Sequence, residues 1–486
     1  MNLQNYIVNR ERHTLLLPIA LFSLVLLFYL ASLSPGPNWG DSAEIQRIAA
    51  TGGIIHYPGY PVYQVLSQLW VRIFRMGSIA WRMNLLSAIF SALTVVGVHH
   101  LVVKLTESRP VALLAALVLT VSGSFWSQAV ITEVYAFHSF LVVALFVLLL
   151  DVGPQRHGRL FLAAYLLGIG LAHHRLILLL LPGVILFLVL RQRHRLLVLN
   201  GYHLIAMLLL MLSGFGFYLV TWASVPWGSL SYFMDYVTHS GGELITLSQP
   251  FEQLRATVMP RLLHQLGWLG VALSLLGLWA LFAQPTRPPA RIGASALIGI
   301  STLLLFGFLV VNRVAEPEAF ASTYQVMSGI LFGVGLAYIL ERLPWLFARR
   351  LSPQLSRAVI IVALATLLLF QASASWPRYS LRTNNETEVV SRQILMALPP
   401  GASIMAPWHL GQGLRYAQEV GGVRENIGII LDEQTPAERI AGYVEQGAPL
   451  YLLGPWYEEA TIEAGYATEF VESFGFVSLY KVIHSP

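Results

Sequence analysis

The sequence predicts an all-α polytopic membrane protein with about eleven transmembrane helices, followed by a small extracytoplasmic α/β domain. Two observations predict this class. Hydrophobic residues make up 56% of the 486 residues and charged residues only 11%, whereas soluble proteins carry about 25% charged residues. Apolar runs of bilayer length fill residues 1–374, while residues 375–486 are polar and acidic. We therefore expect a transmembrane domain and a soluble domain with these bounds, and we exclude ordinary cytosolic, disordered and fibrous proteins.

The apolar runs predict the individual spans, because a helix needs about 20 mostly apolar residues to cross a bilayer. The fifth and sixth runs are short and are separated only by His173-His174-Arg175, so we expect them to be tilted or partly re-entrant. The eleven runs lie near residues 14–33, 83–103, 110–129, 134–151, 160–174, 176–190, 196–223, 262–283, 292–312, 323–341 and 357–374.

Basic residues in the short loops predict the orientation, since Lys and Arg are enriched on the cytoplasmic side. With a cytoplasmic N-terminus, the inner loops hold 15 Lys and Arg residues, and the outer loops hold 8 in nearly twice the length. This asymmetry favours an odd number of spans in the inner (plasma) membrane and a C-terminal domain outside the cytoplasm. The long loops 34–82 and 224–261 then also face outward, so we expect the function on that side.

The tail alternates strand-like runs with helical stretches, which predicts a small α/β domain. Residues 1–374 carry a net charge of +11 and the tail carries −6, so the basic character belongs to the membrane body and indicates no nucleic-acid partner. The absence of cysteine excludes disulfides, thiolate nucleophiles and Cys-type zinc sites. Strand-like runs lie at 403–406, 427–431, 450–453 and 476–482, and helical stretches at 411–418, 435–445 and 457–464.

The strongest local signal is Asp41 followed by Glu44, directly after the first span. If a helix begins here, residues three apart share one face, and two carboxylates project together at the outer membrane surface. The alternative is a capping box, in which the two acids only satisfy the helix N-terminus.

A turn with aromatic residues follows at His56-Tyr57-Pro58-Gly59-Tyr60. Its prolines and glycine predict a non-helical turn. His56, Tyr57 and Tyr60 could anchor the chain at the membrane interface, or they could form a stacking floor for a sugar ring.

Ionisable residues also mark the outer ends of later spans. Glu133, with Tyr135 beside it, lies near membrane depth, where charge is costly and is a functional candidate; the alternative is a carboxylate at a helix start. Glu316 and Glu318 flank Pro317 after the ninth span, where they are either part of a site or a solvated loop.

The His173-His174-Arg175 cluster suits an anionic group such as a lipid phosphate. A lone Arg here could simply snorkel to the interface. Zinc is a weak alternative, because adjacent His side chains on a helix point about 100° apart and no third ligand is evident.

Together, the outer hairpins bring carboxylates and cations to one leaflet. A chemistry that fits this arrangement uses a lipid-anchored, phosphate-activated donor and an acceptor from outside. One carboxylate would deprotonate an acceptor hydroxyl, and cations would stabilise the departing phosphate.

An ordered set of motifs runs along the membrane body. They are Gly40-Asp41-Ser42-x-Glu44, His56-x-Pro58-Gly59-Tyr60-Pro61, Asn84-x-x-Ser87-Ala88, Ala92-Leu93-Thr94, Phe125-Trp126-x-Gln128-Ala129, Glu133-Val134-Tyr135, Gly170-Leu171-Ala172-x-His174 and, more loosely, Glu316-x-Glu318-x-Phe320 with Tyr324. On this set, and over residues 12–340, the chain resembles the bacterial protein O-mannosyltransferase-like membrane family of the GT-C glycosyltransferase superfamily.

The resemblance implies a GT-C-like fold and transfer of a sugar, with mannose as one candidate, from a polyprenyl-phosphate donor to a hydroxyl, generally with inversion. Asp41 matches the residue taken as the general base, and Glu44 would assist it by hydrogen bonding or by orienting the acceptor. His174 and Arg175 would lie near the donor phosphate. Ala43 stands where Gly is expected and Tyr57 where Pro is expected.

Several features stay open at this stage. No cofactor is required; a divalent metal could bind the two carboxylates, but a base mechanism does without it. The acceptor is a protein, a lipid or a glycan. The alternative function is a transporter or flippase of lipid-linked sugars without covalent chemistry, for which mid-membrane charges and an internal repeat would be expected.

Overall fold

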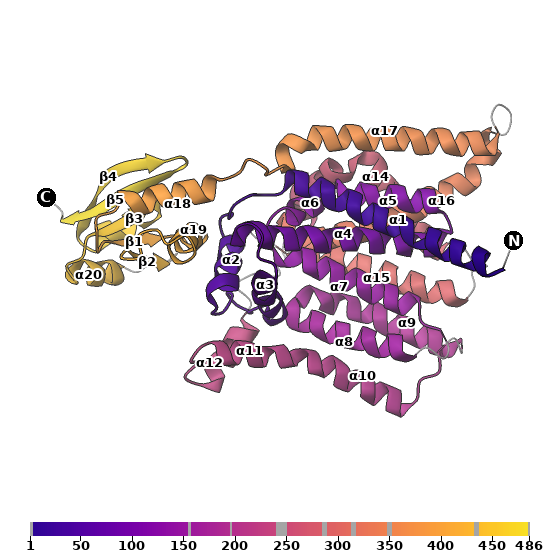
Figure 1. Ribbon diagram of the computed structural model, residues 1–486, viewed down its shortest axis with the longest axis horizontal. Helices are drawn as coiled ribbons and strands as arrows, with labels where there is room; N and C mark the ends of the chain where they lie inside the picture. Colours follow the sequence, from indigo (N-terminus) through magenta and orange to yellow (C-terminus); the bar gives the residue numbers. More distant parts are fainter. Residues whose placement is uncertain are drawn as a thin grey trace.

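The computed structural model describes residues 3–153, 157–194, 197–239, 250–283, 289–312, 317–347, 352–431 and 437–484. Figure 1 shows a bundle of long helices with a smaller sheet-containing domain at one end. The N-terminus lies at the opposite end of the bundle, and the short helices α2, α3 and α12 lie at the end that carries the small domain. The fold thus gathers the predicted outer loops and the tail at one end.

In the described part of the membrane body, each predicted run is mostly helical. The helical elements that build the bundle are α1 (Leu3–Ser32), α4 (Ile79–Thr106), α5 (Arg109–Thr120), α6 (Gly123–Ala129), α7 (Val134–Leu150), α8 (His157–His173), η1 (Arg175–Leu180), α9 (Leu181–Arg193), α10 (Gly201–Ser213), η2 (Gly214–Phe217), α11 (Tyr218–Ser224), α14 (Met259–Phe282), α15 (Pro289–Val311), α16 (Pro317–Phe347) and α17 (Pro353–Tyr379). The shorter elements at the domain-bearing end are α2 (Asp41–Thr51), α3 (Pro61–Ile73), α12 (Leu230–Thr238), α13 (Pro250–Gln253) and the π-helix η3 (Leu254–Val258).

Among the described residues, seven helical stretches are long and apolar enough to cross a membrane, or eight if the bent pair α5–α6 is one span. The axes of α5 and α6 differ by 68°, so the predicted span 110–129 is a broken one. The stretch Leu16–Ser32 of α1 and the helix Val134–Leu150 are apolar but shorter. Each predicted run is therefore helical and the chain is a membrane protein, while the count of eleven spans stays a prediction.

Close helix packing builds the core of the bundle. Helices α14 and α16 approach through Gly277 and Gly335, where a Cβ atom would lie 1.9 Å and 2.0 Å from a backbone oxygen of the other helix. Small residues at such crossings let the two helix backbones approach closely. Close packing of this kind drives helix association in a membrane, because lipid tails are as apolar as the side chains and hydrophobic burial between helices gives no driving force. Helix α4 packs against α1, α5 and α7, and Asn84 near its N-terminal end is hydrogen-bonded to Gln46 of α2, the helix that carries the candidate site.

The C-terminal domain is a five-stranded sheet in the order β2-β1-β3-β5-β4, with parallel pairs β1/β2 and β1/β3 and antiparallel pairs β3/β5 and β4/β5. The predicted α/β class is confirmed. Its elements are α18 (Glu386–Ala397), β1 (Ser403–Ala406), α19 (Trp408–Glu419), β2 (Gly428–Leu431), α20 (Ala437–Glu445), β3 (Leu450–Leu453), η4 (Pro455–Tyr457), α21 (Glu458–Glu463), β4 (Tyr466–Phe474) and β5 (Val477–His484).

Helix α19 docks the C-terminal domain onto α2. The N-terminal ends of the two helices lie next to each other, where the amide of Gly40 donates to the carbonyl of His409 at 2.9 Å. Farther along, the Arg47 guanidinium and the Glu419 carboxylate lie 2.9 Å apart. The amide of Ala80, at the start of α4, donates to the Tyr416 hydroxyl at 3.3 Å. The soluble domain therefore rests directly on the helix that opens with Asp41.

Candidate active site

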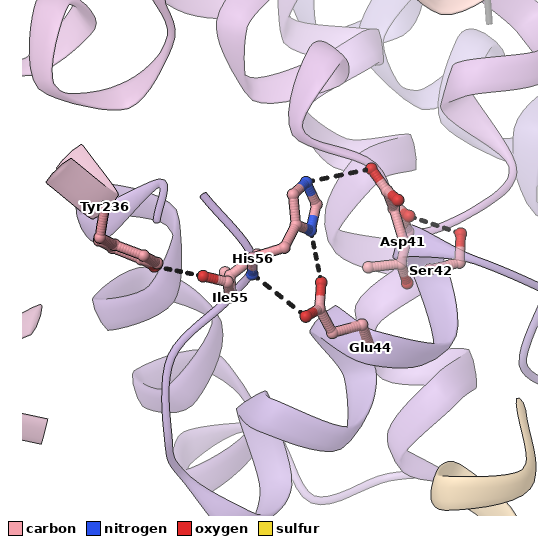
Figure 2. Close-up of polar contacts among 7 residues, drawn as sticks. Asp41, Ser42, Glu44, Ile55, His56 and Tyr236 are labelled. Atoms are coloured by element: carbon pink, nitrogen blue, oxygen red, sulfur yellow. Dashed lines mark hydrogen bonds and ion pairs between the residues drawn. The ribbon is translucent and has the colours of Figure 1, made fainter. Parts of the chain in front are cut away.

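Asp41, Glu44 and His56 form one compact cluster (Figure 2). Both carboxylate oxygens of Glu44 contact His56. Oε2 lies 2.6 Å from the ring Nδ1, and Oε1 accepts a hydrogen bond from the His56 backbone N–H at 3.1 Å. The other ring nitrogen, Nε2, lies 3.7 Å from Asp41 Oδ2. The imidazole thus lies between the two carboxylates.

Local sequence explains why the acids converge. Helix α2 begins at Asp41 after Gly40, whose φ of 72° suits glycine. Both acids lie in the first turn, where the helix dipole favours negative charge. The predicted shared face is confirmed. The capping-box alternative is wrong, because Gly40 is the N-cap and offers no side-chain hydrogen bond.

Exposure separates the roles of the two carboxylates. The Asp41 side chain is 28% exposed and the Glu44 side chain 6%. Burial raises the pKa of Asp41, the positive charge of His56 lowers that pKa, and the negative charge of Glu44 raises it. Asp41 is therefore the carboxylate that a substrate can reach and whose basicity is increased, and Glu44 is the one that holds His56.

A buried polar network fixes α2 against the bundle. Ser42 donates to the Thr132 carbonyl at 2.6 Å, and the Gln46 amide donates to Thr132 Oγ1 at 2.8 Å and Asn84 Oδ1 at 3.0 Å. Asn84 in turn donates to the carbonyls of Ser34 and Gly36. In the sequence, Ser42 and Asn84 stand out only as parts of motifs. Their structural role could not be predicted, because the residues that they contact lie far away in the chain.

The two tyrosines of the predicted turn have different surroundings. Tyr60 is the N-cap of α3 with a left-handed φ of 43°, and its ring lies 5.6 Å from His56 and 5.9 Å, stacked, from His174. Tyr57 is 44% exposed, and its ring lies 4.1 Å from that of His239. Tyr60 therefore joins the cluster, and Tyr57 lines its outer edge.

Rings connect this turn to the predicted phosphate cluster. His174 is buried, with ring centroids of Tyr135 at 5.2 Å and His138 at 5.1 Å. His173 is also buried, and its Nε2 donates to the Val134 carbonyl at 3.1 Å. The structure thus brings Tyr60, Tyr135 and both histidines together behind His56.

The remaining predicted acids lie elsewhere or act differently. Glu133 is buried and is the N-cap of α7, but its side chain makes no cap hydrogen bond, so a plain helix-start role does not describe it. Its amide donates to Ser87 Oγ at 3.4 Å. Glu318 is partly exposed and lies 3.9 Å from Arg378 of α17. Glu316 lies outside the described residues.

Arg175 is exposed, and its guanidinium group contacts the C-terminal end of α12. One guanidinium nitrogen donates to the carbonyls of Val237 and His239, at 2.7 Å and 2.9 Å. A second cation, Arg261, lines a cavity of about 20 Å³ together with Gln265 and Gln325. Sequence reasoning counted Arg261 only as a loop charge.

The C-terminal domain adds a residue to this neighbourhood. The Trp408 ring, at the first position of α19, lies edge-on to His56 with centroids 5.3 Å apart. Nothing in the local sequence linked Trp408 to His56, because the contact depends on domain docking. Among the described residues, no group of three or more His, Cys, Asp or Glu side chains has the arrangement of a metal site.

Solved structures of other proteins have a similar fold. ArnT from Cupriavidus metallidurans, in a crystal structure bound to undecaprenyl phosphate, superposes with a TM-score of 0.62 over 96% of this chain and 98% of that one, at 16% identity. The chain has the GT-C fold. Arabinofuranosyltransferase AftD from mycobacteria shares it, with a TM-score of 0.54 over 96% of this chain and 40% of that one, at 13% identity.

Sequence comparisons narrow the relationship within the GT-C fold. Residues 41–197 match the family model described as "Protein O-mannosyl-transferase TMEM260 N-terminal domain". The protein O-mannosyl-transferase TMEM260 of Mus musculus is 24% identical over 453 residues, which cover 86% of this chain and 63% of the mouse protein. The Dictyostelium discoideum protein of the same name is 23% identical, over 55% of this chain and 36% of its own length.

These findings confirm the resemblance to O-mannosyltransferases. The chain spans less than two thirds of the length of either relative. The family match begins at Asp41, the first residue of α2, so the candidate cluster lies inside the matched region.

Proposed function

We propose that the protein is a membrane glycosyltransferase that moves a sugar from a polyprenyl-phosphate donor to an acceptor hydroxyl, with Asp41 as the general base. The observation that carries the proposal is the Asp41–His56–Glu44 cluster, in which the more exposed carboxylate has a raised pKa. The relatives' name indicates mannose as the first sugar to test and a protein as the first acceptor; lipid and glycan acceptors are the others.

The reaction is an in-line displacement. The acceptor hydroxyl gives its proton to Asp41, and its oxygen forms a bond to the sugar C1 as the bond between C1 and the phosphate oxygen breaks. The electron pair of that bond goes to polyprenyl phosphate, which leaves. Because phosphate is a good leaving group, no second acid is needed, and attack from the opposite face inverts the anomeric centre.

The donor phosphate would lie against the ring cluster of His173 and His174, with Arg175 or Arg261 supplying positive charge. Tyr60 and Tyr135 would border the sugar, as would His56 and Tyr57 on the outer edge. Glu133 would lie at the rear of this site, and Glu318 near its far rim. In this arrangement Glu44 acts through His56 and does not touch the acceptor.

The location of the site supports an extracytoplasmic reaction. The cluster and the C-terminal domain lie at one end of the bundle, and the N-terminus lies at the other (Figure 1). Together with the basic residues of the opposite loops, this favours a cytoplasmic N-terminus in the inner membrane.

The test uses the purified full chain in detergent, with polyprenyl-phosphate mannose and a serine- and threonine-containing peptide. We expect equal amounts of mannosyl peptide and free polyprenyl phosphate, with inverted configuration at C1. A donor that stays intact with peptide, lipid and glycan acceptors contradicts the proposal. If the intact lipid-linked sugar instead crosses reconstituted vesicles, the chain is a transporter.

A further inference from the structure

We propose that Tyr236 of α12 is a positioning residue that holds His56 between Asp41 and Glu44. The proposal rests on the proposed function, because it concerns the same base. The proposal assigns a role to α12, which lies in the predicted outer loop 224–261 and for which the sequence alone indicates no function.

The peptide unit between Ile55 and His56 is held from both sides (Figure 2). Its carbonyl, on Ile55, accepts a hydrogen bond from the Tyr236 hydroxyl. Its N–H, on His56, donates to Glu44 Oε1 at 3.1 Å. One bond comes from α12 and the other from α2, so the backbone from which the imidazole projects is fixed by two separate segments.

A second contact binds Tyr236 to the same turn. A Cβ atom on Gly59 would lie 2.7 Å from the Tyr236 hydroxyl oxygen, and the φ of Gly59 is +98°. The tyrosine thus occupies the space that a side chain at position 59 would need. The ring also packs against Trp227 at 4.8 Å, so the hydroxyl reaches the turn from a supported ring.

Helix α12 is anchored at its C-terminal end. Arg175 donates to the carbonyls of Val237 and His239, directly after Tyr236. Carbonyls at a helix C-terminus lack partners within the helix and carry partial negative charge, so an Arg there stabilises the end. Arg175 and Tyr236 therefore form one unit: the cation fixes α12, and the tyrosine transmits that position to His56.

The consequence for the chemistry follows from charge. His56 Nε2 lies 3.7 Å from Asp41 Oδ2, and the positive charge of the ring favours the ionised form of Asp41. If His56 moves away, the pKa of Asp41 rises and a smaller fraction of the base is ionised at a given pH. Loss of the Tyr236 hydroxyl should therefore move the acid limb of the activity profile to higher pH.

The test is Tyr236→Phe, which keeps the ring and removes only the donor. We expect kcat to fall about tenfold, as for loss of one hydrogen bond. The KM for polyprenyl-phosphate mannose should stay within about twofold, and the acid limb of kcat should shift upward in pH. The matched control is Tyr232→Phe on the same helix, where the ring is 64% exposed; it should behave as wild type.

Arg175→Met supplies a second variant. If Arg175 acts through α12, this variant lowers kcat with the same upward shift, and Tyr236→Phe/Arg175→Met loses little more than the worse single variant. Effects that multiply in the double variant, or an unchanged acid limb in Tyr236→Phe, overturn the proposal. Asp41→Asn is assayed alongside: if it keeps wild-type transfer, the proposed function fails, and if it is inactive while Tyr236→Phe matches Tyr232→Phe, only this inference fails.

Discussion

At Asp41, two neighbours of opposite charge act on one carboxyl group. His56 lowers its pKa and Glu44 raises it, while burial raises it further. A general base works best when its pKa approaches the operating pH. In the proposed mechanism, this balance therefore determines the pH range of the transfer reaction.

The two neighbours should therefore shift the pH profile in opposite directions. We expect His56→Gln to move the acid limb of kcat to higher pH, because a cationic neighbour is lost. Glu44→Gln should move it to lower pH, because an anionic neighbour is lost. Activity measured across the acid range checks both. Shifts in the same direction would contradict the electrostatic account of Asp41.

At this scale the sequence predicted only part of the site. The i, i+3 spacing of Asp41 and Glu44 is local, so helical geometry alone placed both on one face. His56 was expected either to anchor the chain at the interface or to stack on a sugar, and its place between the acids was not predicted. The Tyr236 hydroxyl that donates to the Ile55 carbonyl, next to His56, lies 181 residues beyond Ile55, and spacing carries no signal at such a separation.

Between elements, buried hydrogen bonds hold α2 in place. Asn84 of α4 joins Gln46 of α2, Thr132 of the loop before α7, and the backbone after α1. All three side chains are fully buried, so removing one leaves polar groups without partners.

We expect Asn84→Leu to lower the free energy of unfolding by about 1–3 kcal/mol, the cost of an unsatisfied buried polar group. Thermal unfolding of the purified protein in detergent measures this effect as a lower Tm. Thr51→Val, at the exposed end of α2, is the control and should leave the Tm unchanged. A Tm for Asn84→Leu equal to that of the control would show that the network does not stabilise α2.

Sequence patterns predicted most elements and missed others, among them α18; for two of the missed features the physical reason is clear. Strand β4 (Tyr466–Phe474) is largely exposed at the sheet edge, so it lacks the apolar alternation by which a half-buried strand is recognised. The bend between α5 and α6 lies inside an apolar run whose proline, Pro110, stands at the start of α5, far from the bend. Hydropathy shows that a segment is apolar enough for a membrane, but it contains no information on whether the helix bends within that segment.

For the whole molecule, the sequence predicted two parts from their opposite charge but not how they meet. Contacts between α2 and α19 join residues more than 350 positions apart, such as Arg47 and Glu419. Because α2 opens with Asp41, docking of the C-terminal domain bears directly on the site.

A charge exchange tests this docking. Arg47→Glu opposes two carboxylates and should weaken the interface by about 1 kcal/mol, since a partly exposed pair contributes little more. Transfer activity should fall a few-fold, and limited proteolysis should release the C-terminal domain sooner. Arg47→Glu/Glu419→Arg should restore both properties. A double variant as impaired as Arg47→Glu would show that this pair does not dock the domain.

The central claim is that the carboxylate of Asp41 takes the acceptor proton. Its most direct test is single-turnover transfer by Asp41→Asn, measured together with binding of polyprenyl-phosphate mannose and the Tm. The account predicts a loss of about 10³-fold or more in the transfer rate, with donor binding and Tm close to wild type. Transfer at the wild-type rate by a folded, donor-binding Asp41→Asn protein would contradict it.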